Sequence, residues 1–215
     1  MIVARGEGGS MAKAGAHHHI TVLAFIVIAT IISGCATVGD QRVNILYQST
    51  AIAKGGSGDL YLVEEPTPGS SYSTPIQYIL GGIKNKDGEQ LGNIVTDKAP
   101  ADLMIDAFYQ EFKGAGYNVV QGNSMPGEAA KGLKLLSVTI KLDEVKGIIV
   151  NSKCIVKISV EPWRNGKAIN KLEYVAEYTD SAMTDREELL LKTILQAIQS
   201  IMKKAVPEIT KVLEQ

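Results

Sequence analysis

Two segments in the middle of the chain alternate strictly between apolar and polar residues, and they constrain the fold more than any other feature. They span residues 136–143 and 153–161. The apolar positions are Leu136, Val138, Ile140 and Leu142 in the first segment, and Cys154, Val156, Ile158 and Val160 in the second. A period of two is that of a strand with one buried face. Asn165-Gly166 follows, and this dipeptide predicts a type I′ hairpin turn. Residues 172–178 alternate again, so the three segments predict an antiparallel meander.

Two helical patterns are predicted to cover one face of this sheet. The first starts near Pro100 and is ended by Gly114-Ala115-Gly116, with Gly114 expected to adopt the left-handed conformation. The second opens with Thr184 and Glu187 in the spacing of a capping box and continues to Pro207, which should end or kink it. Shorter strand signals are residues 43–48, 59–63, 78–83, 91–95 and 117–120. The predicted class is α+β: an antiparallel sheet, made of the meander and N-terminal strands, with two helices on one face.

The N-terminal residues have the three-part order of a secretory signal peptide. Lys13 precedes the apolar residues 20–32, and small residues then lead to Cys35. A membrane-spanning helix needs roughly 20 apolar residues, so this run is too short to span. The alternative, in which Cys35 is a buried cysteine of a signal-anchor helix, stays open.

Ile32-Ser33-Gly34-Cys35 resembles the lipobox of bacterial lipoproteins. The resemblance implies cleavage between Gly34 and Cys35, and acylation of Cys35 by three chains, palmitate among the acyl groups of such anchors. Two chains already give stable anchoring. Ala36, in place of an aspartate, implies export to the periplasmic face of the outer membrane. The predicted organisation is a signal peptide at 1–34, a lipidated tether at 35–42, and one periplasmic domain at 43–215 with a Pro/Ser-rich loop at 65–75.

The composition of the mature chain argues against several classes of site. All three histidines, His17 to His19, lie in the signal peptide, so histidine-based catalysis and zinc sites of His and Cys are excluded. The chain carries 22 basic and 23 acidic residues without blocks, so no nucleic-acid partner is expected. No cofactor or metal is expected either. The pairs Asp143-Glu144 and Glu187-Glu188 are interpreted as solvated or capping residues rather than an acid/base dyad.

Two residues have a functional and a structural interpretation. Cys154, the only thiol of the mature chain, shares the apolar face of its strand, which favours a buried hydrophobic residue over a reactive one. Trp163 is the only tryptophan and stands at a hairpin end. It is a possible partner contact, since tryptophan is enriched in binding hot spots, while packing over the sheet edge is the commoner role.

The pattern from residue 77 to 204 resembles the YajG-type uncharacterised bacterial lipoproteins. The segments that carry the resemblance are residues 78–83, Leu91-Gly92-Asn93-Ile94 and, most specifically, Phe112-Lys113-Gly114-Ala115-Gly116-Tyr117-Asn118-Val119. It implies an envelope lipoprotein without known catalysis. Residues 42–75 do not map onto the family.

The expected function is therefore that of a non-enzymatic lipoprotein anchored in the outer membrane, with a structural or accessory role through binding another cell-envelope component. The alternative is a lipid-binding auxiliary lipoprotein of an ABC-type lipid transport system. An open apolar pocket of a few hundred Å³ would favour the alternative. An anchored hydrolase is a third, weaker hypothesis.

Overall fold

The computed structural model describes residues 39–50, 52–64, 77–127, 131–183 and 186–215. All of them belong to one unit, Val38–Gln215, which is separate from the unit Met1–Thr37. None of the helices in the described ranges is both long enough and apolar enough to span a bilayer.

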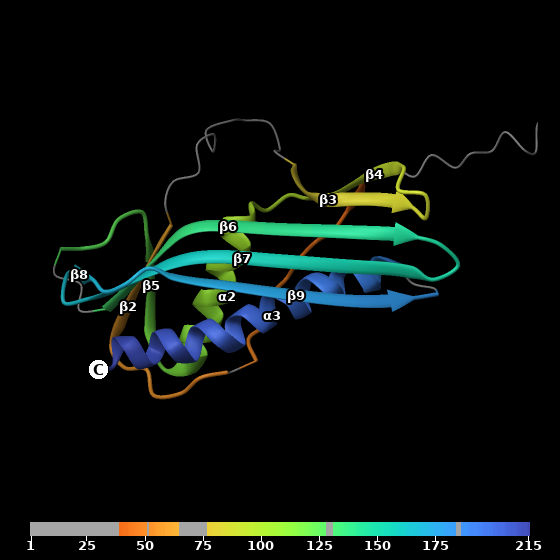
Figure 1. Cartoon of the computed structure of the whole chain (residues 1–215). Helices are drawn as coiled ribbons and strands as arrows, with labels where there is room; N and C mark the ends of the chain where they lie inside the picture. Colours follow the sequence, from red (N-terminus) through yellow and green to blue (C-terminus); the bar gives the residue numbers. More distant parts are fainter. Residues whose placement is uncertain (1–38, 51, 65–76, 128–130, 184–185) are drawn as a thin grey trace, which may run out of the picture. The chain divides into compact units, whose positions relative to one another are not determined.

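Three long strands form the body of the sheet (Figure 1). They are β6 (Lys131–Lys146), β7 (Val150–Arg164) and β9 (Leu172–Ala182), and they pair antiparallel in chain order. The short β8 (Lys167–Ala168) pairs with the end of β7. The turn between them is the predicted one, because Asn165 and Gly166 have φ values of 51° and 71°.

The other strands make the sheet mixed. Both β2 (Asp59–Glu64) and β3 (Tyr78–Asn85) pair parallel with the edge of β6 that β7 leaves free. Outside them, β5 (Asn118–Gly122) is parallel to β2, β4 (Gln90–Thr96) is antiparallel to β3, and β1 (Gln41–Arg42) is parallel to β4.

The prediction of an antiparallel sheet is therefore wrong, although the α+β class holds. Four of the pairings are parallel. Parallel neighbours need long connections, and here the chain passes through β3, β4 and α2 between β2 and β5. Alternation reveals that a segment is a strand, whereas its partners depend on contacts between residues far apart in sequence.

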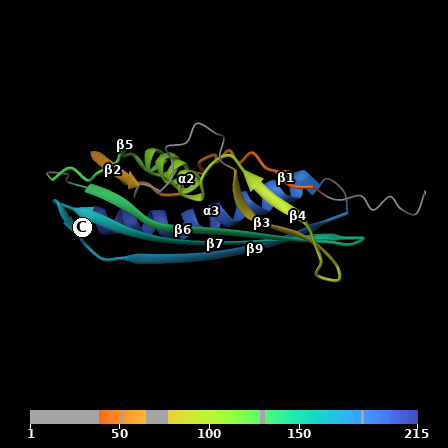
Figure 2. The ribbon, with the colours of Figure 1, turned by 90° about the horizontal axis from the view of Figure 1, so that it is seen from above.

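Two helices lie on the same side of the sheet (Figure 2). α2 (Pro100–Ala115) ends within the predicted Gly114-Ala115-Gly116 segment, but the left-handed residue is Gly116, with a φ of 111°, and not Gly114. The amides of Gly116 and Tyr117 bond back to carbonyls of the last turn. α3 (Arg186–Leu213) continues through Pro207, which the sequence predicted to end or kink it. The predicted capping box includes Thr184, which lies outside the described residues.

The core lies between the helices and the sheet. The apolar faces expected for β7 and for the centre of α3 are buried. In β6, a register shift between Leu135 and Ser137 changes the phase of alternation. This bulge leaves Leu136 half-buried, while Leu135 and Ile140 on either side are buried.

Residues 43–48 do not form the predicted strand. They are extended without a ladder, and their alternation is nevertheless expressed in burial: Val43, Ile45 and Tyr47 are buried while Leu46 is exposed. Val43 N donates to Val95 O of β4 at 2.9 Å. Farther along, Tyr47 bonds α2: its carbonyl accepts from Gln110 Nε2 and its hydroxyl donates to Glu111 Oε1.

Candidate functional site

The structure tests some of the predicted site residues. Gly34, Cys35 and Ala36 lie outside the described residues. Cys154 is buried and free, and burial raises the pKa of its thiol to about 12, which confirms its interpretation as a core residue. Trp163 lies on β7 and is half-buried; its indole Nε1 donates to Glu161 Oε2 at 2.8 Å.

Glu111 on α2 organises the segment before β2. Its side chain is fully buried and accepts hydrogen bonds from Tyr47 Oη (2.6 Å), Thr50 N (2.8 Å) and Ile52 N (3.2 Å). Burial raises the pKa of this carboxyl, but these hydrogen bonds outweigh burial and hold the pKa below its usual value. An ionised acceptor surrounded by donors is a structural clamp, because its lone pairs are already used.

Glu144 on β6 is also fully buried, so the prediction that it is solvated is wrong. Glu187 and Glu188 are exposed, as predicted. The guanidinium of Arg186, at the start of α3, bonds Glu144 Oε1. Burial raises the pKa of Glu144 above its usual value although Arg186 acts in the opposite direction.

A serine lies across the strands from Glu144. Ser152 on β7 is paired with it, and Ser152 Oγ and Glu144 Oε2 are buried without a hydrogen-bond partner. A hydroxyl beside a carboxylate could serve as nucleophile and base. Both side chains are fully buried, however, so a substrate has no access to them in this conformation.

A third polar cluster joins the C-terminus to the loop before β2. Lys131 Nζ lies 2.6 and 2.7 Å from the two carboxylate oxygens of Glu214 and donates to Ser57 O at 2.9 Å. Burial raises the pKa of Glu214, but hydrogen bonds led by that of Lys131 lower it to about 2. The charges of Lys131 and Glu214 therefore neutralise each other.

A pocket of about 310 Å³ lies beside this cluster. It is lined by Ala53, Lys54, Gly55, Pro207, Thr210, Lys211 and Glu214. Two ammonium groups and a carboxylate border it beside apolar atoms, so its lining is mixed. Within the described ranges, no group of three or more His, Cys, Asp or Glu side chains is placed to hold a metal ion.

One surface feature was not predicted from the sequence. The turn between β6 and β7 exposes Ile148 (91 %) and Ile149 (47 %), beside Val145 and Met183. The signal in the sequence is the apolar pair that follows Gly147, where a strand-to-strand turn would normally be polar.

No family model and no curated protein matches the chain. Among solved structures, a Xanthomonas campestris protein assigned to DUF330 is 9% identical, with 82% of this chain and 96% of that one covered and a TM-score of 0.46. A minor lipoprotein from Acinetobacter baumannii is 13% identical over 79% and 92%, with a TM-score of 0.35. The rare lipoprotein B from Shewanella oneidensis is 11% identical over 63% and 98%, with a TM-score of 0.35. TM-scores below 0.5 assign the chain neither a fold family nor a function, and the YajG-type resemblance stays a prediction.

Proposed function

We propose that the chain is a bacterial lipoprotein, cleaved after Gly34, acylated on Cys35 and anchored at the periplasmic face of the outer membrane. The observation that carries the proposal is the position of the lipobox directly before the folded unit. That unit begins at Val38, and its first sheet residue is Gln41. Cleavage before Cys35 would leave every described strand and helix in the mature protein.

The proposed role is non-enzymatic: the domain binds another component of the cell envelope. Its buried groups support this role, because Glu111 is occupied by donors and Glu144, Ser152 and Cys154 are fully buried. Histidine is absent from residues 35–215. Trp163, half-buried at the β7–β8 end, is the proposed contact for a protein partner.

The lipid-binding alternative has weaker support. It needs an apolar groove open to solvent, and the pocket beside Lys54 and Lys211 has a mixed lining of charged and apolar groups. An acyl chain would gain little from leaving a membrane for such a site.

The anchor is tested by Cys35→Ser, with Cys154→Ser as the matched control. Since only Cys35 is proposed to be acylated, Cys35→Ser should accumulate as an unprocessed precursor without diacylglycerol mass. The control should be processed and acylated like the wild type, because Cys154 is buried in the core. Intact-protein mass spectrometry of membrane and soluble fractions makes the comparison. Normal processing and membrane retention of Cys35→Ser would contradict the proposal.

A further inference from the structure

Four exposed apolar side chains gather at one end of the sheet. They are Val145 (39 % exposed), Ile148 (91 %), Ile149 (47 %) and Met183 (73 %), and we call them the apolar tip. The first three belong to the β6–β7 hairpin. Val150 pairs with Ala182, so Met183 follows the end of β9 next to Ile149. Exposed apolar groups that cluster in this way mark an interaction surface.

The direction of β1 shows where the N-terminal segment leaves the sheet. Gln41 pairs with Ile94, Ile94 with Gly81, and Gly81 with Leu142 of β6. β1 is parallel to β4, β4 is antiparallel to β3, and β3 is parallel to β6. Moving back along the chain from Gln41 therefore follows β6 forward, toward the turn that carries Ile148.

Asp40 continues this course by one residue. Its Oδ1 accepts hydrogen bonds from Asn93 N at 2.9 Å and Asn93 Nδ2 at 3.0 Å. Asn93 pairs with Gly82, and Gly82 with Asp143. Asp40 therefore lies level with Asp143, about 16 Å along the strand from Ile148 at about 3.3 Å per residue.

The length of the tether limits where an anchor on Cys35 can lie. Cys35 precedes Asp40 by five residues, which span at most about 18 Å when fully extended. That reach extends to the level of Ile148. It does not extend to the other end of β6, where Lys131 lies roughly 40 Å from the level of Asp40.

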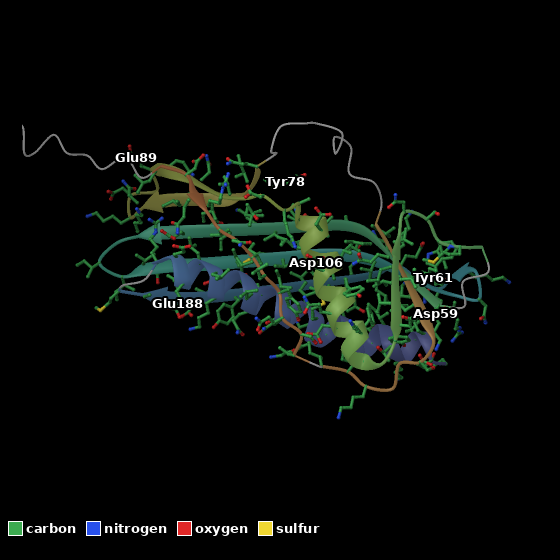
Figure 3. All side chains as sticks on the ribbon, turned by 180° about the vertical axis from the view of Figure 1, so that it is seen from behind. Asp59, Tyr61, Tyr78, Glu89, Asp106 and Glu188 are labelled. Atoms are coloured by element: carbon green, nitrogen blue, oxygen red, sulfur yellow. The ribbon has the colours of Figure 1, made fainter. Side chains whose placement is uncertain are left out.

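We infer that the apolar tip enters the interfacial layer of the same bilayer that holds the acyl chains of Cys35. The inference rests on the proposed acylation. A bilayer is the occupant that the geometry favours, because the tether holds this end, and not the opposite one, within reach of the lipid. Ile148 and Ile149 would leave water for the acyl boundary. The neighbouring β3–β4 turn, with Lys86, Asp87 and Glu89, is charged and exposed and suits the headgroup level. Figure 3 labels Glu89 at this turn.

Tryptophan introduced at Ile148 tests this contact. The acylated Ile148→Trp protein is reconstituted in vesicles of phosphatidylethanolamine and phosphatidylglycerol, with and without brominated acyl chains. Bromine quenches an indole only on close approach, so the added emission should fall at least twofold and shift to shorter wavelength. The matched control is Val175→Trp: Val175 is 52 % exposed but lies on β9, level with Lys157. Its emission should not change. Both variants also contain Trp163, and its emission is removed by subtracting the wild-type spectrum.

The mass of the N-terminal peptide separates the two possible failures. If Cys35 carries no lipid and the protein does not bind vesicles, the proposed function fails and the inference fails with it. If Cys35 is acylated and the protein is bound, but the indole at position 148 is unquenched and emits as in water, the inference alone is overturned. A tip that contacts a protein partner instead of lipid would give this second result.

Discussion

At the scale of single residues, two fully buried glutamates have pKa values shifted in opposite directions. Around Glu111, bonds from Tyr47 and the backbone amides of Thr50 and Ile52 outweigh burial, so the charged form is favoured. Around Glu144, burial outweighs the nearby Arg186, so the pKa lies above its usual value. The number of donors that reach each carboxylate decides the direction, which makes the two residues respond differently to pH.

Glu111→Gln should destabilise the domain by about 2 kcal/mol near pH 7. The substitution removes the charge from the acceptor and turns one of its oxygens into an NH₂ group, which faces the same donors and cannot accept from them. The folded pKa is below the ordinary 4.5. The stability that the Glu111 charge contributes is therefore complete above pH 4.5 and is lost as the pH falls through the folded pKa. The difference in the free energy of unfolding between Glu111→Gln and the wild type should accordingly narrow in acid. Urea unfolding at pH 7 and pH 4 measures this. Tyr47→Phe, which removes one donor, should lose only about 1 kcal/mol; an equal loss for both variants would contradict the clamp.

Arg186→Met should destabilise by about 3 kcal/mol at pH 8, since it leaves an ionised Glu144 buried without its partner. The folded pKa of Glu144 is raised, and without Arg186 it rises further, so the carboxyl takes up a proton as the pH falls. The deficit should accordingly shrink between pH 8 and pH 5. Thermal unfolding across that range is the measurement. The matched control, Lys153→Met, removes an exposed pair with Glu177 and should leave stability unchanged. A deficit for Arg186→Met that is independent of pH would contradict this account.

At the scale of the elements, local patterns predicted what each segment is, and distant contacts decided what it pairs with. The segments of β2, β3, β4, β6, β7 and β9 were predicted as strands, and the Asn165-Gly166 turn was predicted by type. The parallel pairings on β6 were not, because nothing in the alternation of β2 specifies a neighbour. Residues 43–48 alternate like a strand but form none; Tyr47 instead bonds Gln110 and Glu111 of α2. Of the candidate site, Cys154 was predicted correctly. Glu144 lies on the same buried face as Ile140 and Leu142, so alternation pointed inward while its charge suggested solvent. The exposure of Ile148 depends on a turn that alternation does not locate.

The parallel contact between β3 and β6 depends on Gly81. A Cβ atom there would lie 1.5 Å from Leu142 O, a backbone atom that cannot move aside without breaking the ladder. Gly81→Ala should therefore destabilise the domain by about 3 kcal/mol and raise amide exchange in β3 and β4 more than in β9. Gly39→Ala is the control, since nothing lies within 4 Å of its Cβ position. Hydrogen exchange and urea unfolding test both variants, and a tolerated Gly81→Ala would mean that β3 does not sit in this register.

At the scale of the folded unit, the two ends of the long strands have different surfaces. The β6–β7 turn carries the apolar tip, and Asp40, at the start of the described chain, lies on the course of β1 toward it. The other end carries Trp163, Lys131 and the pocket beside Lys54. The two ends are about 50 Å apart along β6 at about 3.3 Å per residue. If the tip lies at the membrane, the Trp163 end projects into the periplasm, where a second envelope component has access to it.

This orientation predicts which position cross-links to which molecule. A benzophenone side chain at Lys167, exposed on β8, should form an adduct with a protein in intact cells, whereas the same group at Ile148 should form adducts with lipid. Because Trp163 pairs with Ala168 beside Lys167, Trp163→Ala should abolish the protein adduct. Val175→Ala, a truncation of an exposed side chain on β9, should leave it intact. Mass spectrometry of the cross-linked products distinguishes the cases. A protein adduct at Ile148 together with no adduct at Lys167 would contradict this orientation. It would place the partner, rather than the bilayer, at the apolar tip.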